Sequence, residues 1–348
     1  MAEKTYTICA IEGDGIGHEV IPAAIRVLKA TGAALTIIQA EAGWACFQTH
    51  GTALPEATVT AAAESDAVLF GAVSSPSFKV EGYRSPIVAL RRRLDLYANL
   101  RPAHSWPIPA SRPDVDLLIV RENSEGLYVQ QERREEVPDG SVRAVAERVI
   151  TERGATRIAH VACRLAHRRK GHLTIVHKAN VLPETCGLFR ETVLAVAEGY
   201  DDLDVDELLV DAAALRLVTD PERFDVLVCP NLFGDILSDE AAGLVGGLGL
   251  APSANVGTSR APALFEPVHG SAPDIAGQGI ANPIAAFLAV AMLLDHVNER
   301  ARAATVRQAV ETILYRGPYT PDLGGEATTN QITNMVESYV GEQSAQRT

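Results

Sequence analysis

The sequence lacks any uninterrupted apolar run close to the roughly 20 residues that a membrane-spanning helix requires. It also lacks a signal-peptide pattern, because Met1 to Lys4 lead directly into the strand-like residues 5–11. We therefore expect a cytoplasmic protein that does not act at a membrane. Aromatic residues are scarce at 5%, but 47% of the 348 residues are hydrophobic, which suffices for a large core and two lobes.

Cysteine is scarce as well. The five cysteines are odd in number, scattered and mostly set in apolar surroundings: Cys9, Cys46, Cys163, Cys186 and Cys229. This distribution indicates neither a disulfide framework nor a zinc knuckle. We interpret these residues as small core side chains.

Basic residues are in deficit, with 31 against 44 acidic residues and a formal charge of −13. Such a charge opposes binding to nucleic acid or to an anionic membrane. An anionic substrate must therefore meet a local basic pocket.

Short β-rich runs alternate with helical ones along the chain, which predicts an α/β architecture. A helix is expected around Ile21 to Leu28, ending near Gly32, and a buried helix after Asn282, with Asn282 as N-cap and Pro283 as first helical residue. The runs that we predict to be buried strands are residues 6–11, 67–73, 117–120, 173–177 and 224–229.

Two loops rich in proline or glycine, residues 102–113 and 257–262, indicate crossings between lobes. We therefore expect a large discontinuous domain of residues 1–103 and 259–348, and a second domain of residues 104–258. The charged segment 130–153 is expected to be an arm, or a helix that packs on another subunit.

The glycines of residues 13–17 lie between a strand and a helix, as phosphate-binding glycines do. Their spacing does not fit the G-x-G-x-x-G fingerprint, because the third glycine comes one residue early. A tight glycine turn is the better interpretation, and an ordinary Rossmann fold is not expected.

Asp235 and Asp239 set two carboxylates four residues apart, just past an apolar run and a glycine. If Asp235 opens a helix, both side chains project from one face, where a divalent cation would offset their repulsion. For these five residues alone, the alternative is that Asp235 caps the helix and Asp239 is solvated.

Several arginines stand at or near the ends of apolar segments in this acidic chain: Arg91, Arg92, Arg93, Arg101 and Arg121. Converging guanidinium groups would suit a substrate with two or three carboxylates. We interpret Arg92 and Arg93 as a solvated helix face. Arg101 and Arg121 come at the ends of strands, where ligand sites of α/β proteins lie.

Tyr128 and Lys178 have a similar placement, and Lys178 directly follows a predicted buried strand. A partly desolvated lysine near a metal can act as a base, and a tyrosine hydroxyl can donate a proton. Taken alone, each residue could equally be structural.

Five ordered motifs resemble those of the β-decarboxylating dehydrogenases, the family of isocitrate, 3-isopropylmalate, tartrate and homoisocitrate dehydrogenases. The resemblance covers nearly the whole chain and implies that family's two-domain α/β fold. The motifs are EGDGIG at residues 12–17, REN at 121–123, HKAN at 177–180, residues 231–239 followed by 243–249, and EPVHGSAPD at 266–274.

Carried over residue by residue, the resemblance implies a shared, metal-dependent active site. Tyr128 would be the general acid and Lys178 the general base or its relay. Asp211, Asp235 and Asp239 would hold Mg²⁺ or Mn²⁺ in the second domain. Because Lys178 and Asp211 reach the site from the neighbouring subunit in this family, a homodimer or a tetramer is implied. The implied substrate-binding residues are Ser75, Val88, Arg91, Arg101, Arg121, Tyr128, Lys178 and Asn180.

The resemblance also predicts the cofactor, because family members that use NADP carry a Lys-Tyr pair where this chain has Asp274 and Ile275. The Asp274 carboxylate would accept hydrogen bonds from the adenosine ribose and would repel a 2′-phosphate. NAD is therefore expected. The implied NAD-binding residues are Val73, Ser74, Ser75, Asn180, Gly270, Ser271, Ala272, Pro273, Asp274 and Asn282.

Residues 80–91 and 126–133 resemble homoisocitrate dehydrogenases, so we expect oxidative decarboxylation of homoisocitrate, as in lysine synthesis through 2-aminoadipate. Val88 departs from some bacterial homoisocitrate enzymes, which have Arg there; Arg84 or Ser85 would then meet the distal carboxylate. A 3-isopropylmalate or isocitrate dehydrogenase is the alternative. A non-catalytic regulatory subunit is disfavoured, because every implied catalytic and metal residue is present.

Overall fold

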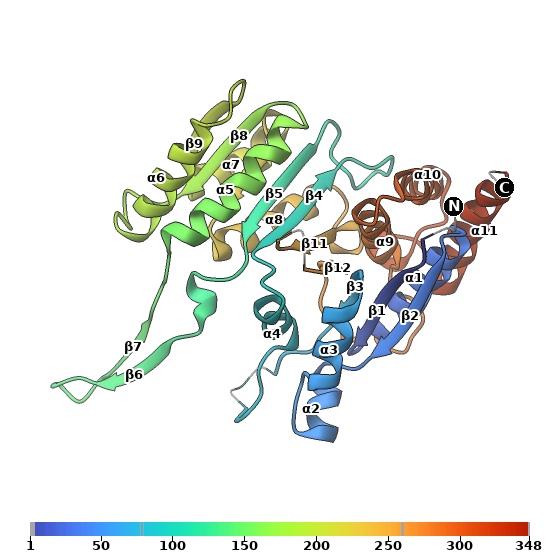
Figure 1. Cartoon of the computed structure of the whole chain (residues 1–348), viewed down its shortest axis with the longest axis horizontal. Coiled ribbons are helices and arrows are strands. Elements are labelled where there is room, and N and C mark those ends of the chain that lie inside the picture. The colour runs from blue at the N-terminus through green and yellow to red at the C-terminus, as the bar shows by residue number, and fades with distance from the viewer. Residues whose placement is uncertain (1–3, 77, 79, 259–260, 347–348) are drawn as a thin grey trace. The chain divides into compact units, whose positions relative to one another are not determined.

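The computed structural model describes residues 4–76, 78, 80–258 and 261–346 (Figure 1). Backbone contacts divide the chain into two compact units. The first unit comprises residues 1–96, 104–114 and 242–348, and the second comprises residues 97–103 and 115–241. Each unit is an α/β structure, as the alternating pattern of the sequence predicts.

A boundary lies at 103/104 as expected, but residues 97–103 belong to the second unit, and residues 104–114 and 242–258 belong to the first. Strand β11 (Pro252–Val256) pairs antiparallel with β12 (Ala263–Pro267), so residues 252–256 belong to the first unit. Strand β4 (Ala98–His104) neighbours β5 (Asp116–Glu122), so most of β4 belongs to the second.

The first unit contains strands in the order β2-β1-β3-β12-β11. Strand β1 (Tyr6–Gly13) pairs parallel with β2 (Leu35–Ala40) and with β3 (Ala67–Ala72). All six residues of β3 are buried, which explains its unbroken apolar sequence. The helices of this unit are α1 (Gly17–Ala30), α2 (Trp44–His50), α3 (Glu56–Glu64), α4 (Pro86–Arg93), α9 (Ile284–His296), α10 (Arg300–Arg316) and α11 (Thr329–Ala345), with short 3₁₀ turns at Leu248–Leu250 and Pro321–Leu323.

Two helices of this unit follow the predicted pattern closely. In α1, Ile21 and Leu28 are fully buried and the helix ends before Gly32, whose φ of 69° suits glycine. Helix α9 is buried along nearly its whole length. Its N-cap is assigned to Pro283, one residue later than predicted, although the Asn282 side chain accepts a hydrogen bond from the Ile284 N–H at 3.0 Å, as an N-cap residue does.

The second unit contains strands in the order β4-β5-β10-β8-β9. Strands β5, β10 (Val226–Cys229), β8 (His172–His177) and β9 (Asp204–Leu209) pair in parallel. Their carboxyl ends therefore lie along one edge of the sheet. The helices are α5 (Glu152–His167), α6 (Thr185–Ala197), α7 (Val210–Thr219) and α8 (Asn231–Leu244), with short 3₁₀ turns at Leu127–Val129 and Pro221–Arg223.

The charged segment forms an arm. Strands β6 (Glu132–Glu136) and β7 (Val142–Ala146) pair with each other as an antiparallel hairpin, and Figure 1 shows this hairpin extending away from the rest of its unit. Four of the five residues in each strand are exposed. The predicted arm is therefore a hairpin, and a helix, α5, begins only at the end of the charged segment.

Across the described part of the chain, no helix is both long and apolar enough to cross a membrane. All five cysteines are buried free thiols.

Candidate active site

The site in the second unit forms where β5 and β10 end side by side. Cys229 is the register partner of Arg121, and α8 begins at Asn231, two residues after β10. A Cβ atom at Gly234 would lie 2.7 Å from the Arg121 Cβ, so only glycine lets the helix approach the strand this closely. The local sequence thus brings α8 against Arg121.

Helix α8 begins four residues before Asp235, so the prediction that Asp235 opens the helix is wrong, and so is the alternative that it caps it. The predicted spacing still places Asp235 and Asp239 one turn apart on the helix. Asp239 is exposed and Asp235 is half-buried. Both carboxylates can therefore serve the same ligand.

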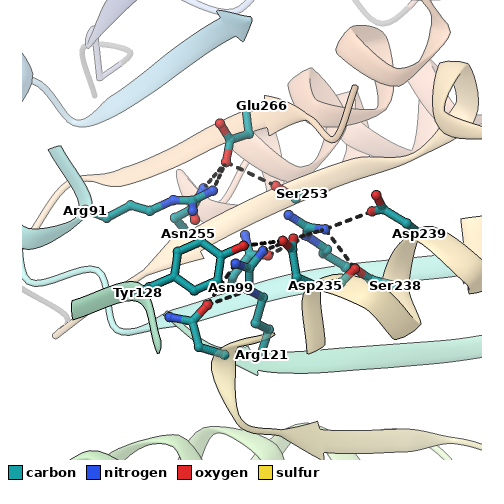
Figure 2. Close-up of polar contacts among 12 residues, drawn as sticks. Arg91, Asn99, Arg121, Tyr128, Asp235, Ser238, Asp239, Ser253, Asn255 and Glu266 are labelled. Atoms are coloured by element: carbon teal, nitrogen blue, oxygen red, sulfur yellow. Dashed lines mark hydrogen bonds and ion pairs between the residues drawn. The ribbon is translucent and has the colours of Figure 1, made fainter. Parts of the chain in front are cut away.

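Arg121 is held by two partners on α8 (Figure 2). Its side chain is 2% exposed; Nη1 pairs with the Asp235 carboxylate, and Nε and Nη2 donate to the Asn231 Oδ1 at 3.0 and 2.8 Å. These contacts fix the plane of the guanidinium group.

Arg101, on β4, reaches the same helix. Its Nη1 lies 3.2 Å from Oδ1 of both Asp235 and Asp239, and donates to the Ser238 Oγ at 2.7 Å. Its Nε donates to the Asn99 Oδ1 at 2.7 Å. Two of the predicted substrate arginines and two of the predicted metal ligands therefore form one cluster.

Tyr128 completes this cluster. Its hydroxyl donates to Oδ2 of Asp235, and its ring lies 4.9 Å from the Arg121 guanidinium carbon. Burial raises the pKa of Tyr128; the charge of Arg121 opposes this rise and the hydrogen bond to Asp235 adds to it. The phenol is therefore protonated at neutral pH and can donate a proton.

Asp239 also titrates unusually. The side chain is 52% exposed, and its partial burial raises the pKa of the carboxyl; Arg101 lowers that pKa and the charge of Asp235 raises it again. The two aspartates thus repel each other, and a cation between them would offset that repulsion.

Lys178 and Asp211 form a separate pair. Lys178 follows β8, Asp211 lies in the first turn of α7, and the Lys178 ammonium donates to the Asp211 carboxylate. This hydrogen bond lowers the pKa of Asp211. Within the described residues of one chain, Asp211 does not join Asp235 and Asp239 in a group of potential ligand atoms lying within 4.8 Å of one another.

In the first unit, Arg91 is buried against Glu266 (Figure 2). The Arg91 Nη2 lies 2.7 Å from the Glu266 Oε1, which also accepts from the Asn255 Nδ2 at 2.7 Å. The buried Arg91 Nε has no hydrogen-bond partner in the part of the chain that the structure describes. Val88 lies three residues earlier on α4 and is half-buried.

The two stretches predicted to bind NAD in this unit lie together. The Ser74 hydroxyl donates to the Ser271 Oγ at 2.8 Å, and Asp274 is exposed. Ser75 is exposed as well. The side chain of Asn282 donates to the Asp322 carboxylate at 3.0 Å. Asn180, in the second unit, is exposed.

His269, next to these residues, is a candidate that sequence reasoning did not single out. Its Nε2 is buried and has no hydrogen-bond partner among the described residues, while Nδ1 faces the Gly270 carbonyl at 3.0 Å. Burial lowers the pKa of His269, so the ring is neutral at pH 7. The unused nitrogen fits a polar group of a cofactor.

The glycine turn packs against both stretches. The Ile16 N–H donates to the Ser271 carbonyl at 2.9 Å, and a Cβ at Gly15 would lie 2.1 Å from that oxygen. A Cβ at Gly13 would lie 1.9 Å from the Ala72 carbonyl. These glycines permit close backbone packing, as the interpretation of a tight turn requires.

Sequence reasoning also missed several supporting residues: Asp14, Asn231, Ser238, Asn255 and Glu266. Asn231, Asp235 and Ser238 recur at the i, i+4, i+7 spacing of one helix face, which was an available signal. Glu266 stands in the motif at residues 266–274, but nothing local indicated its partner, and Asn255 offered no signal, because Arg91 is distant in sequence.

The chain is similar to several known dehydrogenases over nearly its whole length. The isocitrate/isopropylmalate dehydrogenase family pattern matches residues 7–338. An isocitrate/homoisocitrate dehydrogenase of Thermus thermophilus is 58% identical over 333 residues, covering 95% of this chain and 97% of that protein. The 3-isopropylmalate/3-methylmalate dehydrogenase of Methanocaldococcus jannaschii is 48% identical, covering 97% of this chain and 100% of that protein. The crystal structure of isocitrate dehydrogenase from Methylococcus capsulatus superposes with a TM-score of 0.92 at 43% identity, covering 97% of this chain and 99% of that one.

Proposed function

Because the chain belongs to the isocitrate/isopropylmalate dehydrogenase family and is a β-decarboxylating dehydrogenase, we propose that it oxidises and decarboxylates homoisocitrate to 2-oxoadipate with NAD. The reaction would serve lysine synthesis through 2-aminoadipate. The observation that carries the proposal is the cluster in which Arg101 and Arg121 meet Asp235 and Tyr128. It combines carboxylate recognition, metal ligands and a proton donor in one unit.

The arginines supply carboxylate recognition. Arg101 and Arg121 are buried. Hydrogen bonds to Asn99 and Asn231 orient their planar guanidinium groups before a ligand binds. In the first unit, Arg91 retains an unused Nε donor next to its contact with Glu266. These three cations suit a substrate that carries several carboxylates.

The carboxylates fit a hard divalent cation. Asp235 and Asp239 offer oxygen ligands one helical turn apart; burial raises the pKa of Asp239, and the charge of Asp235 adds to this rise. With Asp211 they would hold Mg²⁺ or Mn²⁺, which supplies Lewis acidity toward the substrate oxygen at C2.

The protein's own groups would move the protons. Lys178, directly or through a relay, would remove the proton of the C2 hydroxyl as hydride leaves C2 for the nicotinamide. Tyr128 would donate its hydroxyl proton to the carbon that loses CO₂. The raised pKa of Tyr128 suits this role, because the donor must be protonated at neutral pH.

NAD would bind to the first unit. Residues 73–75 and 270–274 lie together there, and the unused Nε2 of His269 matches a polar group of the cofactor. The Asp274 side chain is exposed and free to accept from the adenosine ribose, and its negative charge would repel the 2′-phosphate of NADP.

We further propose a homodimer with shared active sites, or a tetramer of such dimers. Among the described residues of one chain, Asp211 does not form a three-ligand group with Asp235 and Asp239, and it is paired with Lys178. A second subunit that brings both residues to the cluster would complete the ligand set and the proton pathway.

A 3-isopropylmalate dehydrogenase is the second candidate, because Val88 is an apolar residue one turn before Arg91 and could line an isopropyl group. Arg84 is exposed in the loop before α4 and could instead meet a distal carboxylate.

The decisive experiment measures NADH formation by the purified protein with Mg²⁺, comparing kcat/KM for homoisocitrate, isocitrate and 3-isopropylmalate, with NADP as a control. We expect the highest value with homoisocitrate and NAD. A preference for 3-isopropylmalate would replace the proposal with an enzyme of leucine synthesis. No turnover of any substrate would indicate a regulatory subunit.

A further inference from the structure

A second group of metal-binding side chains lies in the first unit, among residues that the proposed reaction does not use. Glu41 directly follows β2, and Cys46 and His50 are one turn apart on α2. A carboxylate oxygen of Glu41, the Cys46 Sγ and a ring nitrogen of His50 all lie within 4.8 Å of one another. Among the described residues, this is the one group of three potential ligands that meets this distance.

Two of the three atoms are close to the separation that a tetrahedral ion needs. The His50 Nε2 lies 3.6 Å from the Glu41 Oε2. Zn–N and Zn–O bonds of about 2.0–2.1 Å place two tetrahedral ligands about 3.3 Å apart. A side-chain movement of a few tenths of an ångström is enough to bring these two atoms to this distance.

The backbone around the group is held in place. The Asp14 carboxylate accepts from the N–H groups of Trp44 at 2.7 Å and Ala45 at 3.0 Å, which fixes the start of α2. The rings of Trp44, Phe47 and Tyr83 pack together with centroids 5.3 to 5.6 Å apart. The ligands are therefore presented by an anchored helix and the end of a strand.

The group opens into a pocket of about 500 Å³ at the carboxyl ends of β1 and β2. Glu12 and His18, which are hydrogen-bonded to each other at 2.8 Å, line the same pocket. Ligands of open parallel sheets bind at such strand ends. The pocket gives an ion a route of entry and room for water in the remaining coordination position.

We infer that Glu41, Cys46 and His50 bind a Zn²⁺ ion, with water as the fourth ligand. Sulfur and imidazole ligands select zinc over the hard ions Mg²⁺ and Mn²⁺ that oxygen ligands prefer. Binding displaces the thiol proton of Cys46 to solvent, which leaves a thiolate on the ion. Cys46 thus differs from the other four cysteines, whose interpretation as core residues stands.

The test loads the full-length, metal-depleted protein with Zn²⁺ in the presence of excess Mg²⁺, removes unbound metal by gel filtration and measures zinc per chain. Cys46→Ser and His50→Ala remove ligands, and Gln48→Ala, at an exposed position on the same helix, is the matched control. We expect the wild type and Gln48→Ala to retain one more zinc ion per chain than the other two variants.

Two further readouts identify the ligand and the site. Co²⁺ in place of Zn²⁺ should give a sulfur-to-cobalt charge-transfer absorption that Cys46→Ser abolishes. Zn²⁺ should raise Tm of the wild type and of Gln48→Ala but not of His50→Ala, because an ion that binds only the folded chain stabilises it.

Equal zinc retention in all four proteins, with no cobalt–thiolate absorption, would overturn the inference and assign any zinc to adventitious surface sites. His50 is exposed, so His50→Ala tests the site even if Cys46→Ser folds poorly. The inference does not depend on which substrate the enzyme oxidises.

Discussion

Lys178 and Asp211 form an ion pair within one chain, between the residue after β8 and the first turn of α7. The proposed base and the proposed third metal ligand are thus held together as a unit. A neighbouring subunit that contributes one of them to a shared site would contribute both.

Mixing two inactive variants tests this sharing. If each site uses Tyr128 of one subunit and Lys178 of the other, a hybrid dimer of Lys178→Ala and Tyr128→Phe has one intact site. Random reassortment should then restore about a quarter of the wild-type activity, since half of the dimers are hybrids. Activity that stays at the level of the separate variants would show that each site is built from one chain.

Tyr128→Phe by itself tests the proton donor. Removing the hydroxyl leaves the ring over Arg121 but deletes the group that would protonate carbon, so kcat should fall by about 10²–10⁴. The KM for substrate should change little, because the arginines remain. A variant with nearly normal kcat would remove Tyr128 from the mechanism.

Asp235→Asn and Asp239→Asn should differ in stability while both impair metal binding. Asp235 is the charge partner of the buried Arg121, so its neutralisation should lower the free energy of unfolding. The Asp239 side chain is 52% exposed, and its neutralisation should leave stability nearly unchanged. Urea unfolding and Mg²⁺ titration of activity measure both effects, and equal loss of stability in the two variants would contradict the expectation.

Glu266→Gln tests the buried partner of Arg91. The side chains of this pair are 10% and 9% exposed, so removing the carboxylate charge should cost about 3–5 kcal/mol of unfolding free energy. Glu56→Gln is the matched control, because Glu56 pairs with Arg93 at the surface, where solvent screens the interaction. Similar losses of unfolding free energy in the two variants would show that burial does not determine how much an ion pair contributes to stability.

The environment of the His177 ring predicts that the stability of the protein depends on pH. Burial lowers the pKa of His177, and the Ala179 N–H donates to its Nδ1 at 3.1 Å, which requires that nitrogen to be unprotonated. The unfolded chain therefore takes up the proton first, and the contribution of His177 is present above about pH 6.5 and is lost as the pH falls below it.

The measurement is the free energy of unfolding from about pH 7.5 to about pH 5.5. It should fall more steeply for the wild type than for His177→Gln. Parallel curves would show that His177 does not contribute to the dependence.

Local patterns in the sequence predicted much of the fold. The five predicted strands are β1, β3, β5, β8 and β10, and their mostly apolar sequences reflect burial of the sheet. Helix α1 followed from spacing, and ordered motifs identified the family. Helix starts were less well predicted: α8 begins at Asn231, because capping and backbone contacts decide such boundaries.

The sequence by itself determined the α/β class, the family and the kinds of side chain that gather at the site, because apolar periodicity and motif spacing are local. Only the tertiary structure decided which partners those side chains meet. Arg91 meets Glu266 across 175 residues and Arg101 meets Asp239 across 138. Asp14, in the turn after β1, anchors the start of α2 through the N–H of Trp44, 30 residues later. Strand order and register produce these contacts, and no short stretch of sequence encodes them.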